Sequence, residues 1–232
     1  MNRTIILHYH LFKNAGTSLD RILRDNFGTR WVTAEFSTAT GDNSPQVAKW
    51  IEAHPDAVAF STHTAMGPIP QIDGVTIISV VLLRDPVARI RSAYRFERKQ
   101  QAETWGAQLA KVNDLEGYVQ TRLGRPGDRQ CRNFQTYRLA SLIPGDESEL
   151  NRATRAMAQL SVVGLVEDFD KIIGQLSEKL RPAFPDFRAE SIRMNTTKPA
   201  PETQTDRRVN ALLEDVNSDD RYLWQLQRDL IG

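Results

Sequence analysis

The 232-residue chain has little cysteine: Cys131 is the one thiol, so an intrachain disulfide and a cysteine-built metal site are both excluded. This composition is typical of proteins from a reducing compartment. The chain also lacks a run of 18 apolar residues, and its N-terminal apolar run, residues 5–7, ends at His8. That run is too short for the core of a signal peptide. These absences predict a cytoplasmic protein without a membrane span.

An excess of charge of either sign is also missing. The sequence has 30 Lys plus Arg against 29 Asp plus Glu, which gives a formal net charge of +1. Proteins that bind nucleic acid or a membrane surface over a broad face normally carry a basic excess, so neither partner is expected. The sum does not exclude a local basic pocket. The length and the 40% hydrophobic content allow a substantial core, and we expect a single domain over 1–232.

Short β-favouring stretches alternate with helical periodicity along the chain. We expect strands at 4–10, 57–61, 75–83 and 161–166, and helices at 17–28, 44–53, 86–103, 114–123, 147–159, 168–180, 204–216 and 218–230. This alternation predicts the α/β class, with a mostly parallel sheet covered by helices on both faces. Loops that follow parallel strands meet at one edge of the sheet, where such folds bind ligands.

The first such loop reads His-Leu-Phe-Lys-Asn-Ala-Gly-Thr-Ser-Leu over residues 10–19. The start of the following helix offers unpaired N–H groups and partial positive charge to an anion. Lys13 adds a full charge, Gly16 allows close backbone approach, and Thr17 and Ser18 add hydroxyl donors. A Walker A loop would place its lysine directly after a glycine, whereas Lys13 precedes Gly16 by three positions. The loop therefore predicts a phosphate-like ligand without ordinary nucleoside triphosphate hydrolysis; the alternative is a surface turn with an incidental lysine.

The second loop follows the most apolar stretch, residues 75–83, which predicts a strand buried on both faces. Arg84 stands at the end of this strand, where a permanent charge is costly unless it meets an anion. Asp85 can cap the next helix and Pro86 can start it. Ser92 lies about two turns further and can return to the same side. Arg84 and Ser92 thus predict a clamp for a second phosphate, and an Arg84–Asp85 surface pair is the alternative.

Together the two segments resemble those of sulfotransferases that use 3′-phosphoadenosine-5′-phosphosulfate (PAPS). Residues 10–19 resemble the loop for the 5′-phosphosulfate, and residues 83–94 resemble the segment for the 3′-phosphate. The likeness is closest to the heparan sulfate 2-O-sulfotransferase-like branch and its small bacterial relatives. Weaker similarities follow at 133–136, 163–170 and 217–223. The resemblance touches most of the chain, but its specific motifs are the first two.

The resemblance implies a P-loop-like three-layer α/β fold and an enzyme that transfers a sulfuryl group from PAPS to an acceptor hydroxyl of a glycan or small molecule, with no metal. The residues that it assigns to the 5′-phosphosulfate are Lys13, Asn14, Ala15, Gly16, Thr17, Ser18 and Leu19. It assigns Arg84 and Ser92 to the 3′-phosphate, and it gives Lys13 the further catalytic role of neutralising charge on the leaving group.

The transfer also needs a base for the proton of the acceptor hydroxyl. His63 follows the strand expected at 57–61, so it would emerge at the ligand edge, and an imidazole titrates in the range that suits this task. In the enzymes that the chain resembles, the base is a histidine after the corresponding strand. The resemblance therefore assigns the role of base to His63. Related sulfotransferases use a glutamate as the base, and Glu35 is the rival because it follows a possible second strand. His8 and His10 share one face of the first strand and could be satisfied residues at the core edge.

Two other classes of function compete with this one. A P-loop kinase or other phosphotransferase would need ATP and magnesium, but the strand at 75–83 ends in Arg84 instead of a magnesium-binding acid. A non-catalytic binding protein with the same fold would not need Lys13, His63 and Arg84 together.

Several features leave alternatives open. Five arginines could line a cleft for an acidic glycan or form a solvated face: Arg122, Arg125, Arg129, Arg132 and Arg138. Lys198 could fold over the nucleotide as a lid. The sequence predicts neither the acceptor nor the oligomeric state.

Overall fold

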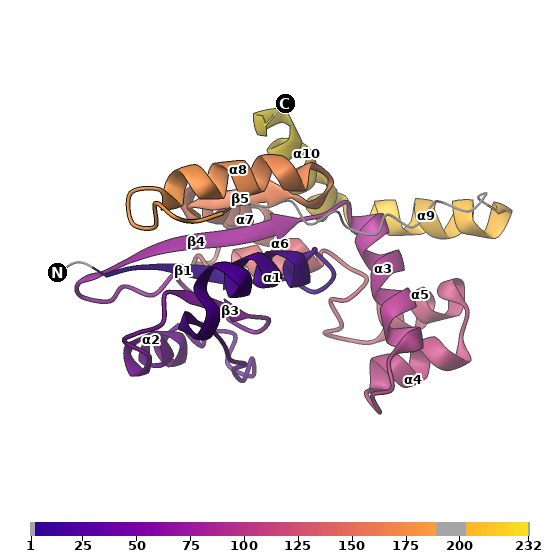
Figure 1. Ribbon diagram of the computed structural model, residues 1–232. Helices are drawn as coiled ribbons and strands as arrows, with labels where there is room; N and C mark the ends of the chain where they lie inside the picture. The colour runs from indigo at the N-terminus through magenta and orange to yellow at the C-terminus, as the bar shows by residue number, and fades with distance from the viewer. Residues whose placement is uncertain (1–2, 189–202, 232) are drawn as a thin grey trace.

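The computed structural model describes residues 3–188 and 203–231. A sheet of five strands runs through its centre in the order β2-β3-β1-β4-β5 (Figure 1). The strands are β1 Arg3–Tyr9, β2 Trp31–Thr33, β3 Ala59–Thr62, β4 Val75–Leu83 and β5 Val162–Leu165. All neighbouring pairs are parallel. Tyr9 pairs with Thr62 on β3 and with Val81 on β4, so the carboxyl ends of these three strands lie at one edge.

Helices cover both faces of the sheet. They are α1 Gly16–Phe27, α2 Ser44–Ala53, α3 Pro86–Lys99, α4 Trp105–Val112, α5 Leu115–Gly124, α6 Phe134–Ala140, α7 Glu149–Gln159, α8 Phe169–Leu180, α9 Gln204–Val216 and α10 Ser218–Ile231. Side chains of β1 alternate between two cores: Ile6 packs with α1 and α8, whereas Ile5 and Leu7 pack in the core shared by α2, α6, α7 and α10. The predicted P-loop-like three-layer α/β class is thereby confirmed.

Helices α3, α4, α5 and α9 project to one side of the sheet (Figure 1). A small core of their own, which includes Ile90, Tyr118 and Val209, joins them. Helix α3 begins directly after β4, with Pro86 in its first turn and Asp85 accepting a hydrogen bond from the Ala88 N–H. The first two turns of α3 therefore stay beside the carboxyl edge of the sheet before the helix leads away from it.

The sequence placed most elements correctly and missed two. Helix α3 ends at Lys99 and not near residue 103, because a separate helix, α4, begins after the cap that the Thr104 side chain provides. Helix α6 was also not expected. Lys198, named above as a residue that could fold over the nucleotide, lies outside the described residues. Within 3–188 and 203–231, no helix is both long enough and apolar enough to cross a membrane.

Candidate active site

The turn between β1 and α1 has an unusual backbone. Lys13 and Ala15 have φ values of 65° and 57°, in the left-handed region, which costs roughly 1–2 kcal/mol for each non-glycine residue. Asn14 lies between them with its side chain buried. Its Nδ2 donates to the Leu82 carbonyl and to Gln135 Oε1, both at 2.7 Å. The turn is therefore anchored to the protein interior at its central residue, while its outer side faces a cavity.

That cavity has a volume of about 300 Å³ and lies at the carboxyl edge of the sheet. It is lined by His10, Phe12, Lys13, Ala15, Gly16, Thr17, Ser18, His63, Arg84, Ser92 and Phe96. The two segments predicted to bind anions and the predicted base thus share one cavity. The side chains of Asn14 and Leu19 do not line it, since the first is anchored inward and the second is fully buried in the core. A ligand in the cavity could meet these two residues only through their backbone.

The cavity wall carries a cluster of positive charge. Arg84 Nη1 donates to the Lys13 carbonyl at 3.0 Å, which ties the two loops together. Burial lowers the pKa of Lys13, and the nearby Arg84 and Arg95 lower it further. Among the residues that the structure describes, no carboxylate lies within ion-pair distance of Lys13 or Arg84. Half-buried cations that lack a carboxylate partner favour an anionic ligand.

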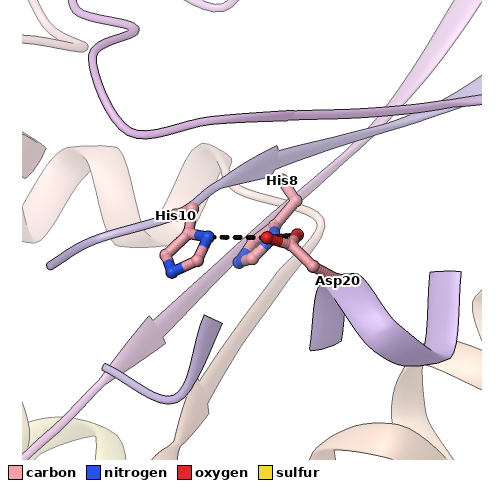
Figure 2. Close-up of side chains that lie close together, drawn as sticks. All are labelled: His8, His10 and Asp20. Carbon is pink, nitrogen blue, oxygen red and sulfur yellow. Dashed lines mark hydrogen bonds and ion pairs between the residues drawn. The ribbon is translucent and has the colours of Figure 1, made fainter. Parts of the chain in front are cut away.

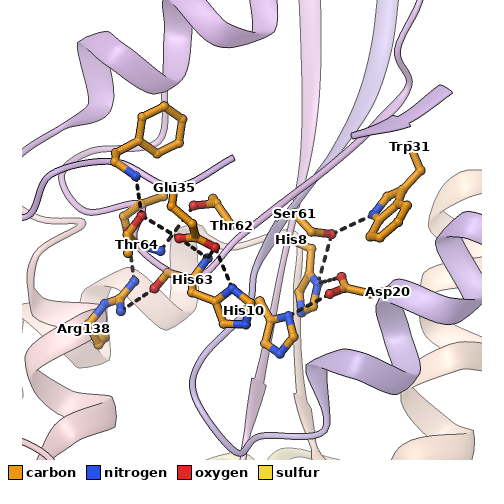
Figure 3. Close-up of polar contacts among 12 residues, drawn as sticks. His8, His10, Asp20, Trp31, Glu35, Ser61, Thr62, His63, Thr64 and Arg138 are labelled. Atoms are coloured by element: carbon orange, nitrogen blue, oxygen red, sulfur yellow. Dashed lines mark hydrogen bonds and ion pairs between the residues drawn. The ribbon is translucent and has the colours of Figure 1, made fainter. Parts of the chain in front are cut away.

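His63, which lines this cavity, pairs with Glu35 (Figure 3). His63 Nδ1 lies 2.6 Å from Glu35 Oε1, and the Thr64 hydroxyl donates to Glu35 Oε2 at 2.7 Å. Although burial alone would raise it, the pKa of Glu35 is lowered by the hydrogen bonds from Thr64 and His63. An ionised carboxylate accepts only, so the imidazole donates through Nδ1 and keeps Nε2 as an acceptor. The two rival bases are therefore partners, with Glu35 orienting His63.

The five arginines of the 122–138 region are engaged within the protein. Arg138 holds the loop that carries His63, since its guanidinium donates to the His63 carbonyl at 2.7 Å and to the Ala65 carbonyl at 2.9 Å. The other partners are Glu97 and Asp128 for Arg122, the Trp105 ring for Arg125, Glu149 for Arg129 and the Leu123 carbonyl for Arg132. These contacts favour structural roles over an open cleft for an acidic glycan.

A second histidine–carboxylate cluster adjoins the cavity through His10, and Figure 2 shows its three members. Asp20 of α1 accepts from His8 Nδ1 at 2.8 Å and from His10 Nδ1 at 2.7 Å. Burial alone would raise the pKa of Asp20, but these hydrogen bonds hold it far below its ordinary value. Both histidines bond this carboxylate through Nδ1, as expected for residues at the core edge, but the buried Nε2 of His8 has no hydrogen-bond partner among the described residues.

In the described ranges, His8, His10 and Asp20 are the one group close enough to hold a metal ion. The Nδ1 atoms of the two histidines contact the carboxylate at hydrogen-bond length, so the three side chains bond one another.

The His10 ring also packs against Gly16, in the turn between β1 and α1. A Cβ built on Gly16 would lie 2.1 Å from His10 Cδ2, so the packing of this ring requires glycine there. On its other side, the His10 ring centroid lies 3.9 Å from that of His63. From the sequence, glycine at position 16 was expected because it lets a ligand approach the backbone closely. The structure adds the packing of the His10 ring as a second reason, which the sequence around Gly16 does not show.

No family model matches the chain. It is 37% identical over 249 residues to an uncharacterized protein of Archaeoglobus fulgidus, in an alignment that covers 99% of this chain and 98% of that protein. The chain belongs to the same family as this archaeal protein. A crystal structure of a sulfotransferase from Alicyclobacillus acidocaldarius is similar with a TM-score of 0.38 and 14% sequence identity, over 97% of this chain and 100% of the other. A likeness at this level says nothing about the site.

Proposed function

We propose that the protein is a sulfotransferase that moves a sulfuryl group from PAPS to an acceptor hydroxyl, in line with the resemblance of its two loops. One observation carries the proposal: Lys13, Arg84, Ser92 and His63 come from separate parts of the chain and line one cavity. The positive charge there suits a donor with anionic groups at both its 5′ and 3′ positions. The Gly16–Ser18 start of α1 faces the same space.

The residues divide the reaction between them. Lys13 and the first turn of α1 bind the 5′-phosphosulfate, while Arg84 and Ser92 bind the 3′-phosphate. The acceptor oxygen attacks sulfur as His63 Nε2 takes its proton, and Glu35 stabilises the imidazolium that forms. The bond between sulfur and the bridging oxygen breaks, and its electron pair stays on 3′,5′-diphosphoadenosine. Lys13 neutralises the charge on that oxygen, so positioning and electrostatics supply the catalysis.

The acceptor in this proposal is the hydroxyl of a glycan or small molecule that approaches from the half-exposed side of His63. A heparan sulfate 2-O-sulfotransferase-like enzyme is the narrower version. The engaged arginines of the 122–138 region favour an acceptor that needs no long basic groove. The kinase alternative gains no support from the cavity, whose strand-end residue is Arg84.

Calorimetry with 3′,5′-diphosphoadenosine and with ATP–Mg²⁺ tests the proposal. We expect the diphosphoadenosine to bind, and Arg84→Ala to weaken it at least about tenfold, because a charged hydrogen-bond partner of the phosphate is lost. Arg91→Ala is the matched control, since Arg91 is on the same helix as Ser92 but pairs with Asp206 and does not line the cavity. Binding of ATP–Mg²⁺ without binding of diphosphoadenosine would overturn the assignment. A turnover assay with PAPS and a panel of hydroxyl acceptors then tests the transfer itself.

A further inference from the structure

The backbone of Arg84 is held by a buried side-chain amide. Gln135, at the start of α6, is 1% exposed. Its Oε1 accepts from the Arg84 N–H at 2.9 Å, and its Nε2 donates to the Arg84 carbonyl at 2.9 Å. A neighbouring strand would supply the same pair of contacts, so the amide fixes the backbone just beyond the last residue of β4.

The same amide holds the other loop of the cavity. Gln135 Oε1 also accepts from Asn14 Nδ2 at 2.7 Å, and that nitrogen donates to the Leu82 carbonyl as well. One side-chain oxygen therefore joins the turn after β1 to the end of β4. These are the two segments that carry Lys13 and Arg84 toward the cavity.

The turn needs such an anchor because its backbone is strained. Lys13 and Ala15 are both left-handed, and Asn14 between them supplies the inward contacts. Non-glycine residues persist in this conformation only where the surroundings enforce it, and they concentrate at functional sites. Loss of the Asn14–Gln135 bond would leave the turn held by the Leu82 carbonyl and by the contact between Arg84 and the Lys13 carbonyl. Lys13 would then have more freedom to relax its backbone and to shift relative to Arg84.

Gln135 is itself fixed from α10. The fully buried Asp220 accepts from the backbone N–H of Gln135 at 3.1 Å and from that of Thr136 at 2.7 Å. The Thr136 hydroxyl donates to the same carboxylate at 2.8 Å. The Gln135 side chain is thus held by a polar network that includes α10, close to the C-terminal end of the chain.

We propose that Gln135 is a positioning residue that sets the spacing between the Lys13 loop and the Arg84 loop. This inference rests on the proposed function. With the spacing fixed, the cavity favours a nucleotide phosphorylated at both the 5′ and the 3′ position over one phosphorylated at the 5′ position alone. Each loop can bind one anion without the Gln135 contacts. The two loops can bind the two phosphates of one ligand only when Lys13 and Arg84 are at the right distance from each other.

The test compares two ligands in Gln135→Leu. Affinities for 3′,5′-diphosphoadenosine and for adenosine 5′-monophosphate are measured by calorimetry, and their ratio gives the preference for the second phosphate. We expect this preference to fall at least about tenfold, while the affinity for the monophosphate changes less than about threefold. Thr136→Val is the matched control, because it removes a hydrogen bond of the same network but touches neither Arg84 nor Asn14. It should lower the melting temperature and leave the preference unchanged.

The outcomes separate this inference from the proposed function. If Gln135→Leu does not fold, Gln135→Met removes the same hydrogen bonds with an unbranched side chain of similar length and is measured in the same way. A preference kept at the wild-type value in the folded variant, with only the melting temperature lowered, overturns the positioning role and leaves the proposed function standing. A wild-type protein that binds neither nucleotide overturns both.

Discussion

Two imidazole–carboxylate pairs at the ends of neighbouring strands differ mainly in their burial. In the His63–Glu35 pair both side chains are half-exposed, at 49% and 50%. In the other cluster Asp20 and its two histidines are between 1% and 15% exposed. The hydrogen bonds are of similar length, so their geometry alone does not separate the two. Burial decides which imidazole an acceptor molecule can reach.

The buried cluster has a structural task. Asp20 lies on α1, whereas His8 lies on β1 and His10 directly after it, so their bonds fasten the first turns of α1 to the strand. His10 in turn contacts the His63 ring. The buried carboxylate belongs to the scaffold, whereas the half-exposed pair is the one that an incoming molecule can reach. The sharpest tests of this difference change one member of each pair.

The largest effect is expected from His63→Ala. Loss of a general base lowers a rate by roughly 10²–10⁴, so turnover of PAPS should fall by that factor. The affinity for 3′,5′-diphosphoadenosine and the melting temperature should stay near wild type, because the side chain is half-exposed. Initial rates with saturating PAPS measure the change. His54→Ala is the control, since His54 is an exposed histidine bonded to the Trp50 carbonyl and does not line the cavity. Unchanged turnover in His63→Ala would remove this residue as the base.

The elements around the cavity could be predicted where the signal is local. Three features depend only on neighbouring residues, and the structure has all of them: the apolar run of β4, the helix start at Asp85–Pro86 and the Gly-Thr-Ser start of α1. The meeting of both loops and His63 in one cavity also followed, because parallel strands bring their carboxyl ends to one edge.

What the sequence could not reveal depends on partners far along the chain. Helix α6 is only seven residues long and takes its N-terminal support from Asp220, about 85 residues later. Glu35 and His63 looked like rivals because nothing local shows that they share a hydrogen bond. The inward direction of Asn14 is set by Gln135, which is 121 positions away.

A smaller effect, on stability, is expected from Asp20→Asn. The carboxylate accepts from two Nδ1 donors, but an amide can accept from one and must present its own N–H to the other. The free energy of unfolding should fall by about 1.5–3 kcal/mol, the range for hydrogen bonds to a charged group. Urea unfolding measures this change. Asp25→Asn on the exposed side of α1 is the matched control and should shift the value by less than about 0.5 kcal/mol. An equal loss in both variants would contradict the structural role of the cluster.

The same carboxylate makes stability depend on acid pH. The pKa of Asp20 is depressed in the folded protein, so its ionisation stabilises the fold above the pKa of the unfolded chain, about 3.9. Below that pH the unfolded state binds the proton more readily, and the stabilisation is lost progressively. The difference in unfolding free energy between wild type and Asp20→Asn should therefore shrink from pH 5 to pH 3. A difference that stays constant over this range would contradict the prediction.

The smallest effect is expected from Glu35→Gln, which sharpens the comparison from the exposed side. The glutamine Oε1 can still accept from His63 Nδ1, so the imidazole keeps its orientation and its Nε2 acceptor. What is lost is the negative charge that stabilises the imidazolium as the proton arrives, because a charge-assisted hydrogen bond is roughly twice as strong as a neutral one. Turnover should fall by about tenfold, equivalent to about 1.4 kcal/mol, with the unfolding free energy close to wild type because the pair is half-exposed. A fall as deep as that of His63→Ala would instead make Glu35 the base, and a loss of stability as large as that of Asp20→Asn would make both pairs part of the scaffold.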